Sequence, residues 1–347
     1  MNKYLLIVLF FVLPLFLTAQ SLESRISNMI VIGFEDSDIN SSHTLYKYLQ
    51  TNSLGGVILF DKNIKNPKQL QNLTSKLKSL SKNRLIIAVD EEGGKVSRLG
   101  KVAGFIKTPS ASKIAEGSLT DAKKRYAKMA KMLQNSGINC NFAPSVDLAI
   151  NPKNIVIVKN ERSFSANPKM VISYANIFIE EMQKRDIITS LKHFPGHGSS
   201  LDDSHDGFVD VSDSWSDIEL IPFQNLKTPI IMTAHIYNKN IDTQYPATLS
   251  YKTNGLLLRE KLGFKGVIIS DDLQMGAISK NYTLKKTLEL CINSGVDMLL
   301  FANQLSEPLN IKEIVTIILE LIREKKIDID KIDKANERIE KLKSEYL

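Results

Sequence analysis

The sequence predicts a single (β/α)8 barrel, an α/β fold, and three observations point to it. Short apolar runs alternate with longer amphipathic segments along nearly the whole chain of 347 residues. Eight of these runs are mostly Ile, Val and Leu without polar alternation, which is typical of parallel strands covered on both faces. Polar and ionisable residues gather where the runs end, as they do at the active-site rim of such barrels.

The predicted strands and helices follow one another in regular order. The eight strands span residues 29–34, 56–60, 85–90, 138–143, 187–193, 229–235, 266–271 and 297–301. Leucines on one stripe predict a helix over residues 67–82. Thr120 and Asp121 begin another helix, and Asn167 followed by Pro168 reads as an N-cap with proline at the first helical position. The apolar face of a last helix is formed by Ile332, Ala335, Ile339 and Leu342.

The alternative fold for alternating strands and helices is an open, doubly wound sheet. Such a sheet usually carries a glycine-rich phosphate turn after its first strand, and residues 33–36 (GFED) do not form one. The sequence also has no internal repeat, low-complexity tract or Pro/Gly/Ser-rich linker. We therefore expect one closed barrel over residues 20–347.

The N-terminus predicts export. Lys3 precedes an apolar run at residues 4–17, and Ala19 supplies a small residue at its exit, which together describe a signal peptide over residues 1–19. The run is shorter than the roughly 20 residues of a membrane span, so cleavage is favoured over an uncleaved anchor. The expected location is periplasmic or extracellular. Cys140 and Cys291 both lie in apolar stretches and are expected to be buried free thiols.

The formal net charge of +7 is spread along the chain, without an arginine-rich arm, a basic aromatic stripe or zinc-finger spacing. This pattern argues against nucleic-acid binding. We expect a monomer without a stable protein partner.

Chemistry-bearing residues concentrate at the strand ends and in one loop. The polar residues at the ends of the runs are Asp90, Asp147, Lys192, His193, His235 and Asp271. The densest segment is 192–198 (KHFPGHG), closely followed by residues 202–205 (DDSH). Its glycines permit unusual backbone angles and its proline stiffens the turn, so the loop suits a binding site better than a plain connection.

These motifs resemble a known family. The run 192–198 together with residues 203–205 resembles the signature of glycoside hydrolase family 3, in its β-N-acetylhexosaminidase branch. Residues 270–275 (SDDLQM) resemble its nucleophile motif, and residues 90–98 (DEEGGKVSR) resemble its first sugar-binding loop. Asn151 and Pro152 followed by residues 161–164 (ERSF) resemble its acetamido-recognition loop. The matches occur in family order and cover about residues 25–305.

The resemblance implies a retaining exo-β-N-acetylglucosaminidase that needs no cofactor. Asp271 would be the nucleophile, and His205 oriented by Asp203 would be the acid/base, because retaining hydrolysis requires one group to attack the anomeric carbon and another to protonate the leaving oxygen. The residues implied to bind the sugar are Asp90, Arg98, Arg162, Lys192 and His193, with Arg162 orienting the acetamido group. With an export signal, the expected substrates are N-acetylglucosamine-containing saccharides or muropeptides from peptidoglycan.

Several neighbouring residues receive supporting roles. Glu91 stands where the family more often has Gln or His and is expected to add a carboxylate near the binding rim. Asp147 and Asp272 are expected to support the site, and His197 to shape its loop. Trp215 is expected to anchor the loop rather than stack on a sugar.

Four alternatives compete with this hypothesis. The histidines and Asp203 also suit a metallohydrolase, but the first three strands lack the His-x-His usual in barrel metallohydrolases, so no metal site is predicted. A phosphorylase using the same histidine acid/base and an inactive envelope glycan-binding protein both remain open. The β-glucosidases of the family generally take their acid/base from a second domain, which we do not expect here because the sequence ends soon after the eighth β/α unit. His235 is open between a substrate contact and a strand-end histidine.

Overall fold

The structure is a computed structural model that describes residues 20–201, 207–304 and 307–347. Eight parallel strands form one sheet in the order β10-β1-β2-β3-β4-β5-β7-β9. Their bounds are β1 Ile30–Gly33, β2 Gly56–Leu59, β3 Ile86–Val89, β4 Cys140–Asn141, β5 Ile188–Phe194, β7 Ile230–Thr233, β9 Val267–Ile269 and β10 Leu299–Phe301. Each lies within or overlaps one predicted strand, so the predicted strand set is confirmed. The predicted signal peptide, residues 1–19, lies outside the described residues.

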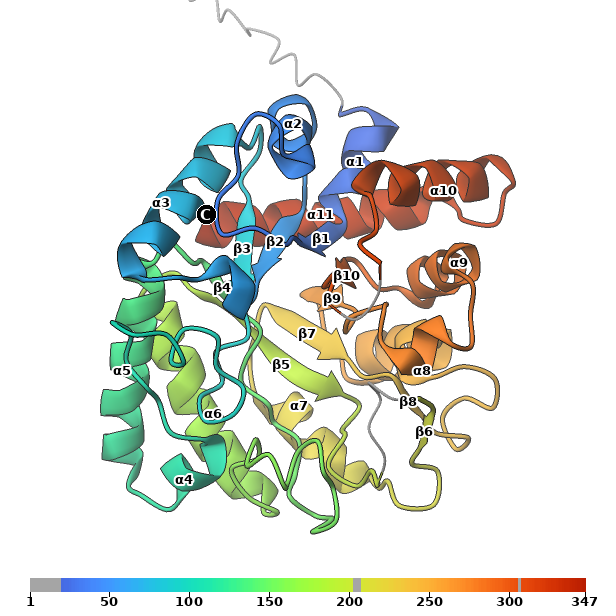
Figure 1. The fold of residues 1–347 in the computed structure, drawn as a ribbon. Helices are drawn as coiled ribbons and strands as arrows, with labels where there is room; N and C mark the ends of the chain where they lie inside the picture. The colour runs from blue at the N-terminus through green and yellow to red at the C-terminus, as the bar shows by residue number, and fades with distance from the viewer. Residues whose placement is uncertain (1–19, 202–206, 305–306) are drawn as a thin grey trace, which may run out of the picture.

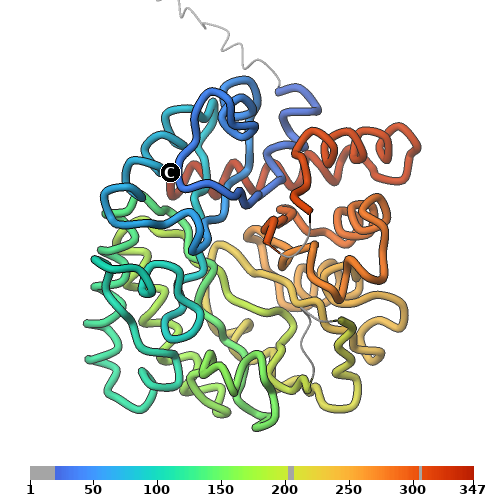
Figure 2. The backbone as a smooth tube through the Cα atoms, viewed as in Figure 1, coloured from blue at the N-terminus to red at the C-terminus, as the bar shows by residue number. Residues whose placement is uncertain are grey.

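The sheet closes into a barrel. β10 pairs with β1 in parallel register, and a parallel bridge between Ile269 and Met298 joins β9 to the start of β10. The Ser270 N–H donates to the Met298 carbonyl at 3.0 Å and supports this seam. The tube in Figure 2 follows the chain around the resulting ring. The predicted (β/α)8 barrel is thereby confirmed, and the open-sheet alternative is wrong.

Helices surround the strands, as Figure 1 shows. The α-helices are α1 Leu22–Asn28, α2 Thr44–Thr51, α3 Pro67–Leu80, α4 Ala111–Ala115, α5 Leu119–Asn135, α6 Pro168–Gln183, α7 Ile221–Asn225, α8 Gly276–Ser279, α9 Leu284–Ser294, α10 Ile311–Arg323 and α11 Ile329–Tyr346. Short 3-10 turns lie at η1 Asp61–Asn63, η2 Asp217–Leu220 and η3 Ala247–Leu249, and η4 Lys252–Lys261 is a π-helix.

Helix starts follow local capping chemistry. The Asn167 side chain accepts from the Lys169 N–H at the start of α6, and Pro168 stands at the first turn, as predicted. α5 begins at Leu119, slightly before the predicted start, because the Ser118 hydroxyl caps it by accepting from the Asp121 N–H at 3.1 Å. The first-turn acid at Asp121 also suits the positive end of the helix dipole.

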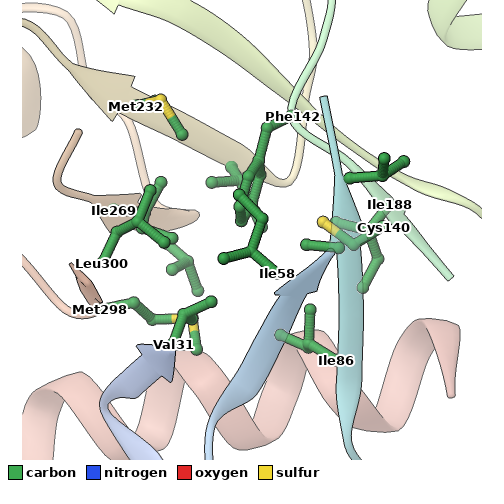
Figure 3. Packing of buried hydrophobic residues seen from close by; sticks show 14 of the residues in the cluster. Val31, Ile58, Ile86, Cys140, Phe142, Ile188, Met232, Ile269, Met298 and Leu300 are labelled. Carbon is green, nitrogen blue, oxygen red and sulfur yellow. The ribbon is translucent and has the colours of Figure 1, made fainter. Parts of the chain in front are cut away.

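The barrel interior is filled by side chains from all eight strands. Figure 3 shows a set of them meeting between the strands. Phe142, Ile188 and Ile269 are among the fully buried ones. Because these side chains fill the space between the strands, the interior is a packed core rather than a channel. Burying one such side chain is worth about 1.5–3 kcal/mol. Cys140 and Cys291 are buried free thiols, as predicted.

A small two-stranded parallel ribbon was not predicted. β6 Val209–Asp210 pairs with β8 Ile236–Tyr237, which follows directly after the end of β7. A separate apolar cluster supports the ribbon, and Trp215 packs against it. Strands of two residues are too short to show a pattern in the sequence.

Candidate active site

A cavity of about 140 Å³ lies at the carboxyl ends of the barrel strands. Its lining residues are Asp90, Val96, Arg98, Val156, Arg162, Lys192, His193, His197, Met232, Asp271, Met275 and Leu300. All five residues expected to bind the sugar are in this set, together with the expected nucleophile. They come from loops after β3, β4 and β9 and from the end of β5, so the closed barrel is what makes them neighbours. Five of the twelve lining side chains are apolar, so the cavity combines charged and apolar groups.

Lys192 is the centre of a buried charge cluster. Its Nζ lies 2.8 Å from Asp90 Oδ1 and 2.7 Å from Glu92 Oε1, and Arg98 Nη2 lies 3.4 Å from Asp90 Oδ2. Burial alone would raise the pKa of Asp90, but Lys192 and Arg98 outweigh it and hold that pKa below its ordinary value. Burial would likewise lower the pKa of Lys192, but Asp90 and Glu92 raise it. Both groups therefore stay ionised at neutral pH.

Glu92 is a site residue that the sequence prediction missed. Arg162 donates two hydrogen bonds to it, from Nε to Oε2 at 3.0 Å and from Nη2 to Oε1 at 2.8 Å. Burial alone would raise the pKa of Glu92, but Arg162 and Lys192 lower it to about 2. A bidentate pair fixes the guanidinium plane, so Glu92 orients Arg162 toward the cavity.

Glu91, the carboxylate expected near the binding rim, is not among the residues that line the cavity. Glu91 is fully buried, and its carboxylate accepts from the Ser97 hydroxyl and from the N–H groups of Arg98 and Leu99. It holds the loop after β3 closed. Asp90 and Glu92, two residues apart, both contact Lys192, whereas Glu91 between them bonds to Ser97 and its own loop. That spacing is the signal by which Glu92 could have been found.

Asp147 positions His193. Its Oδ2 accepts from His193 Nδ1 at 2.6 Å, and its carboxylate also accepts from the backbone N–H groups of His193 and His197. A carboxylate only accepts and a guanidinium only donates, so His193 carries its proton on Nδ1 and accepts from Arg162 Nη2 at Nε2, 3.1 Å away. Burial alone would raise the pKa of Asp147, but His193 lowers it well below its ordinary value. Asp147 thus supports the site by fixing one neutral tautomer.

Glu219 and Trp215 support the loop at residues 195–200. Gly196 has φ of 119°, and a Cβ there would meet the Glu219 side chain at 2.6 Å. Glu219 Oε2 accepts from the Gly198 N–H at 2.8 Å, and Trp215 Nε1 donates to the Pro195 carbonyl at 3.1 Å. Trp215 is not among the residues that line the cavity. Its expected role as a loop anchor fits these contacts.

Asp271 follows the end of β9 and is partly exposed in the cavity. Its Oδ1 accepts from the Asp272 N–H at 2.8 Å. Asp272 is buried and accepts from the Ala302 N–H at 3.0 Å, which ties the segment after β9 to the residue that follows β10. His235 is buried with Nδ1 beside the Thr248 hydroxyl and Nε2 beside the Asp272 carbonyl, both at 2.8 Å. These contacts fit the strand-end interpretation of His235.

Asp203 and His205, the expected acid/base pair, lie outside the described residues. Among the residues that are described, no group of three or more His, Cys, Asp or Glu side chains is arranged to hold a metal ion. Within residues 20–201, 207–304 and 307–347, no helix combines the length and apolar content needed to cross a membrane.

Comparison with known proteins gives a consistent set of relatives. The glycosyl hydrolase family 3 N-terminal domain matches residues 21–342. A curated β-hexosaminidase A of Pseudoalteromonas piscicida is 34% identical over 322 residues, and a β-hexosaminidase of Alkalilimnicola ehrlichii is 35% identical over 263 residues. The alignments cover 84% and 72% of this chain, and 53% and 74% of those proteins. The chain thus spans about half the length of the Pseudoalteromonas protein.

A solved structure of similar shape is that of a family 3 β-N-acetylglucosaminidase from Paenibacillus sp. It superimposes with a TM-score of 0.86 and 28% identity over 94% of this chain and 62% of that chain.

Proposed function

The chain belongs to glycosyl hydrolase family 3, and on that premise we propose that it is a retaining exo-β-N-acetylglucosaminidase acting through a covalent glycosyl-Asp271 intermediate. The observation that carries the proposal is the convergence of Asp90, Lys192, His193, Arg162 and Asp271 on one cavity at the carboxyl ends of the strands. The names of the relatives, β-hexosaminidase and β-N-acetylglucosaminidase, support the choice of substrate.

The charge cluster suits recognition of sugar hydroxyls. The Asp90 carboxylate accepts hydrogen bonds, and Lys192 and Arg98 beside it donate them, so vicinal hydroxyls find both kinds of partner in fixed geometry. Because these groups already pair with one another, they need little rearrangement when a sugar enters. Sugar binding then holds the anomeric carbon near Asp271.

The reaction requires two steps at the anomeric carbon. Asp271 attacks it while the bond to the leaving oxygen breaks, and water later displaces the carboxylate. We assign the proton transfers to His205, oriented by Asp203. Asp271 is exposed enough to reach a ligand and has its backbone neighbour Asp272 tied to the residue that follows β10, so its position is well defined.

The physiological setting is part of the proposal. We infer that residues 1–19 direct export and that the substrates are N-acetylglucosaminyl fragments of peptidoglycan or related envelope glycans. The motivating feature is the basic, apolar and small-residue order of the N-terminus. N-terminal sequencing of the protein from envelope fractions tests export, and an intact Met1 in the cytoplasmic fraction alone would refute it.

Hydrolysis of an aryl β-N-acetylglucosaminide beside the matching β-glucoside tests the reaction. We expect activity on the N-acetyl substrate, abolished in Asp271→Ala while sugar affinity remains. Asp213→Ala is the control, because it removes the same kind of carboxylate from an exposed position. Activity that depends on added phosphate would indicate a phosphorylase instead. Sugar binding without turnover under any condition would indicate a glycan-binding protein.

The acid role of His205 has its own test. His205→Ala should slow substrates with poor leaving groups far more than activated aryl glycosides, because only the former need a proton at the departing oxygen. Steady-state rates on an aryl glycoside and on a β-linked disaccharide give the comparison. An equal fall on both substrates would refute the assignment.

A further inference from the structure

A buried ring nitrogen of His197 has no partner among the described residues. The side chain is 2% exposed, and no donor or acceptor within residues 20–201, 207–304 and 307–347 pairs with Nε2. A buried polar atom left without a partner costs about 1–3 kcal/mol, and native proteins rarely leave one without a ligand or ordered water. His197 also lines the cavity that holds Asp90 and Asp271. The orphan nitrogen therefore belongs to a side chain at the sugar site.

The contacts of the opposite ring edge favour a proton on Nε2. His197 Nδ1 lies 2.7 Å from the Ser200 hydroxyl oxygen. That hydroxyl has one proton to give, and its other candidate acceptor, the His197 carbonyl, is farther away at 3.1 Å and already accepts from Asn154 Nδ2 at 2.8 Å. We assign the Ser200 proton to Nδ1, the shorter of its two contacts, and this assignment makes Nε2 a donor. Burial and the nearby His193 lower the pKa of His197 to about 4, so the ring is neutral.

The surroundings of His197 suit the acetamido group of the sugar. Arg162 and Val156 lie on the same loop as Asn154, which donates to the carbonyls of His197 and Gly198. A sugar hydroxyl both donates and accepts, whereas an amide carbonyl oxygen only accepts, so a fixed donor in a cavity that also has apolar side chains matches the acetyl group better. The methyl of that group would pack against apolar lining side chains such as Val156 or Met232.

We propose that His197 Nε2–H donates a hydrogen bond to the carbonyl oxygen of the 2-acetamido group and so contributes to the preference for N-acetylglucosamine over glucose. This inference rests on the proposed function for its ligand. It gives the second histidine of the loop a direct contact with substrate, beyond its expected part in shaping the loop.

Two substitutions separate a sugar contact from a loop-shaping role. His197→Asn keeps an amide oxygen near the position of Nδ1, where it can accept from Ser200, but does not reach the place of Nε2. His197→Gln reaches that place with an amide NH2 but gives up the contact with Ser200. The binding constants of N-acetylglucosamine and glucose for each variant and for wild type are measured by calorimetry, and urea unfolding reports the integrity of each fold.

We expect His197→Asn to weaken N-acetylglucosamine about tenfold, as loss of one hydrogen bond implies, with little change for glucose. His197→Gln should restore most of the affinity for N-acetylglucosamine. The proposal is overturned if His197→Asn binds N-acetylglucosamine normally, if both sugars weaken equally, or if the order of the two variants is reversed. The first result would assign the orphan nitrogen to a buried water.

A measurement on the wild-type protein covers the case in which a variant does not fold. In protein labelled with 15N-histidine, the His197 proton should be on Nε2 and its resonance should shift on addition of N-acetylglucosamine but not of glucose. A proton on Nδ1, or no shift, overturns the proposal. These readouts measure sugar binding and the position of a proton, and neither depends on hydrolysis. A protein that binds N-acetylglucosamine but hydrolyses nothing would therefore refute the proposed hydrolase and still test the role of His197.

Discussion

Replacing Glu219 by Gln should change how stability depends on pH. Glu219 is 1% exposed, and burial raises its pKa from the ordinary 4.5 to about 7. An acid with a raised pKa in the folded state contributes stability that is fully present below pH 4.5 and is lost as the pH rises through about 7. Each unit of pKa corresponds to about 1.4 kcal/mol, so the interval from 4.5 to about 7 is worth about 3 kcal/mol.

Urea unfolding of wild type and Glu219→Gln between about pH 4 and about pH 8 measures this difference. The glutamine keeps an oxygen that can accept from the Gly198 N–H but does not titrate. Relative to the variant, the wild type should lose about 3 kcal/mol across this range, most of it between pH 4.5 and about 7. Glu337→Gln, on the exposed side of α11, controls for the loss of one carboxylate. Parallel curves for wild type and Glu219→Gln would refute the reasoning.

Three further predictions concern packing, charge and thiol burial. Gly198→Ala should lower the free energy of unfolding in urea by about 1–3 kcal/mol, because the new Cβ would lie 1.9 Å from a backbone carbonyl oxygen. Gly207→Ala is the control and should be neutral, because its Cβ would have nothing within 4 Å. Equal effects of the two substitutions would contradict this. Glu92→Gln should lower the free energy of unfolding by about 3 kcal/mol and weaken sugar binding, since it breaks a buried ion-pair cluster, and wild-type values for both would be evidence against that account. Cys140 and Cys291 should resist a thiol reagent in the folded protein and react in urea, because burial raises the pKa of both thiols; rapid labelling of the native state would contradict it.

The barrel was predictable because its strands are buried on both faces. A strand such as Ile86–Val89 has no polar residue in it, so the run stands out in the sequence without any alternation. The ribbon of β6 and β8 was not predictable, because two paired residues on each side carry no period. Its stability comes from contacts among Val209, Ile236 and Trp215 that only the folded chain brings together.

The sequence predicted which residues form the site better than it predicted how they contact one another. Motifs and strand ends located Asp90, Lys192 and Asp271, and barrel closure made them neighbours. Glu92 received no predicted role, because its contacts with Arg162 and Lys192 join residues that are far apart in the sequence. The single proton on His193 depends on its partners on both sides, which are distant in sequence.

The seam between β9 and β10 has a consequence for how activity returns on refolding. Asp271 stands two residues beyond the bridge at Ile269, so the expected nucleophile is held where the last two strands of the barrel, β9 and β10, meet. Helices and early strand pairs can form before that junction does. We expect the circular dichroism signal to recover before catalysis, so that the regain of turnover reports when β9 and β10 join.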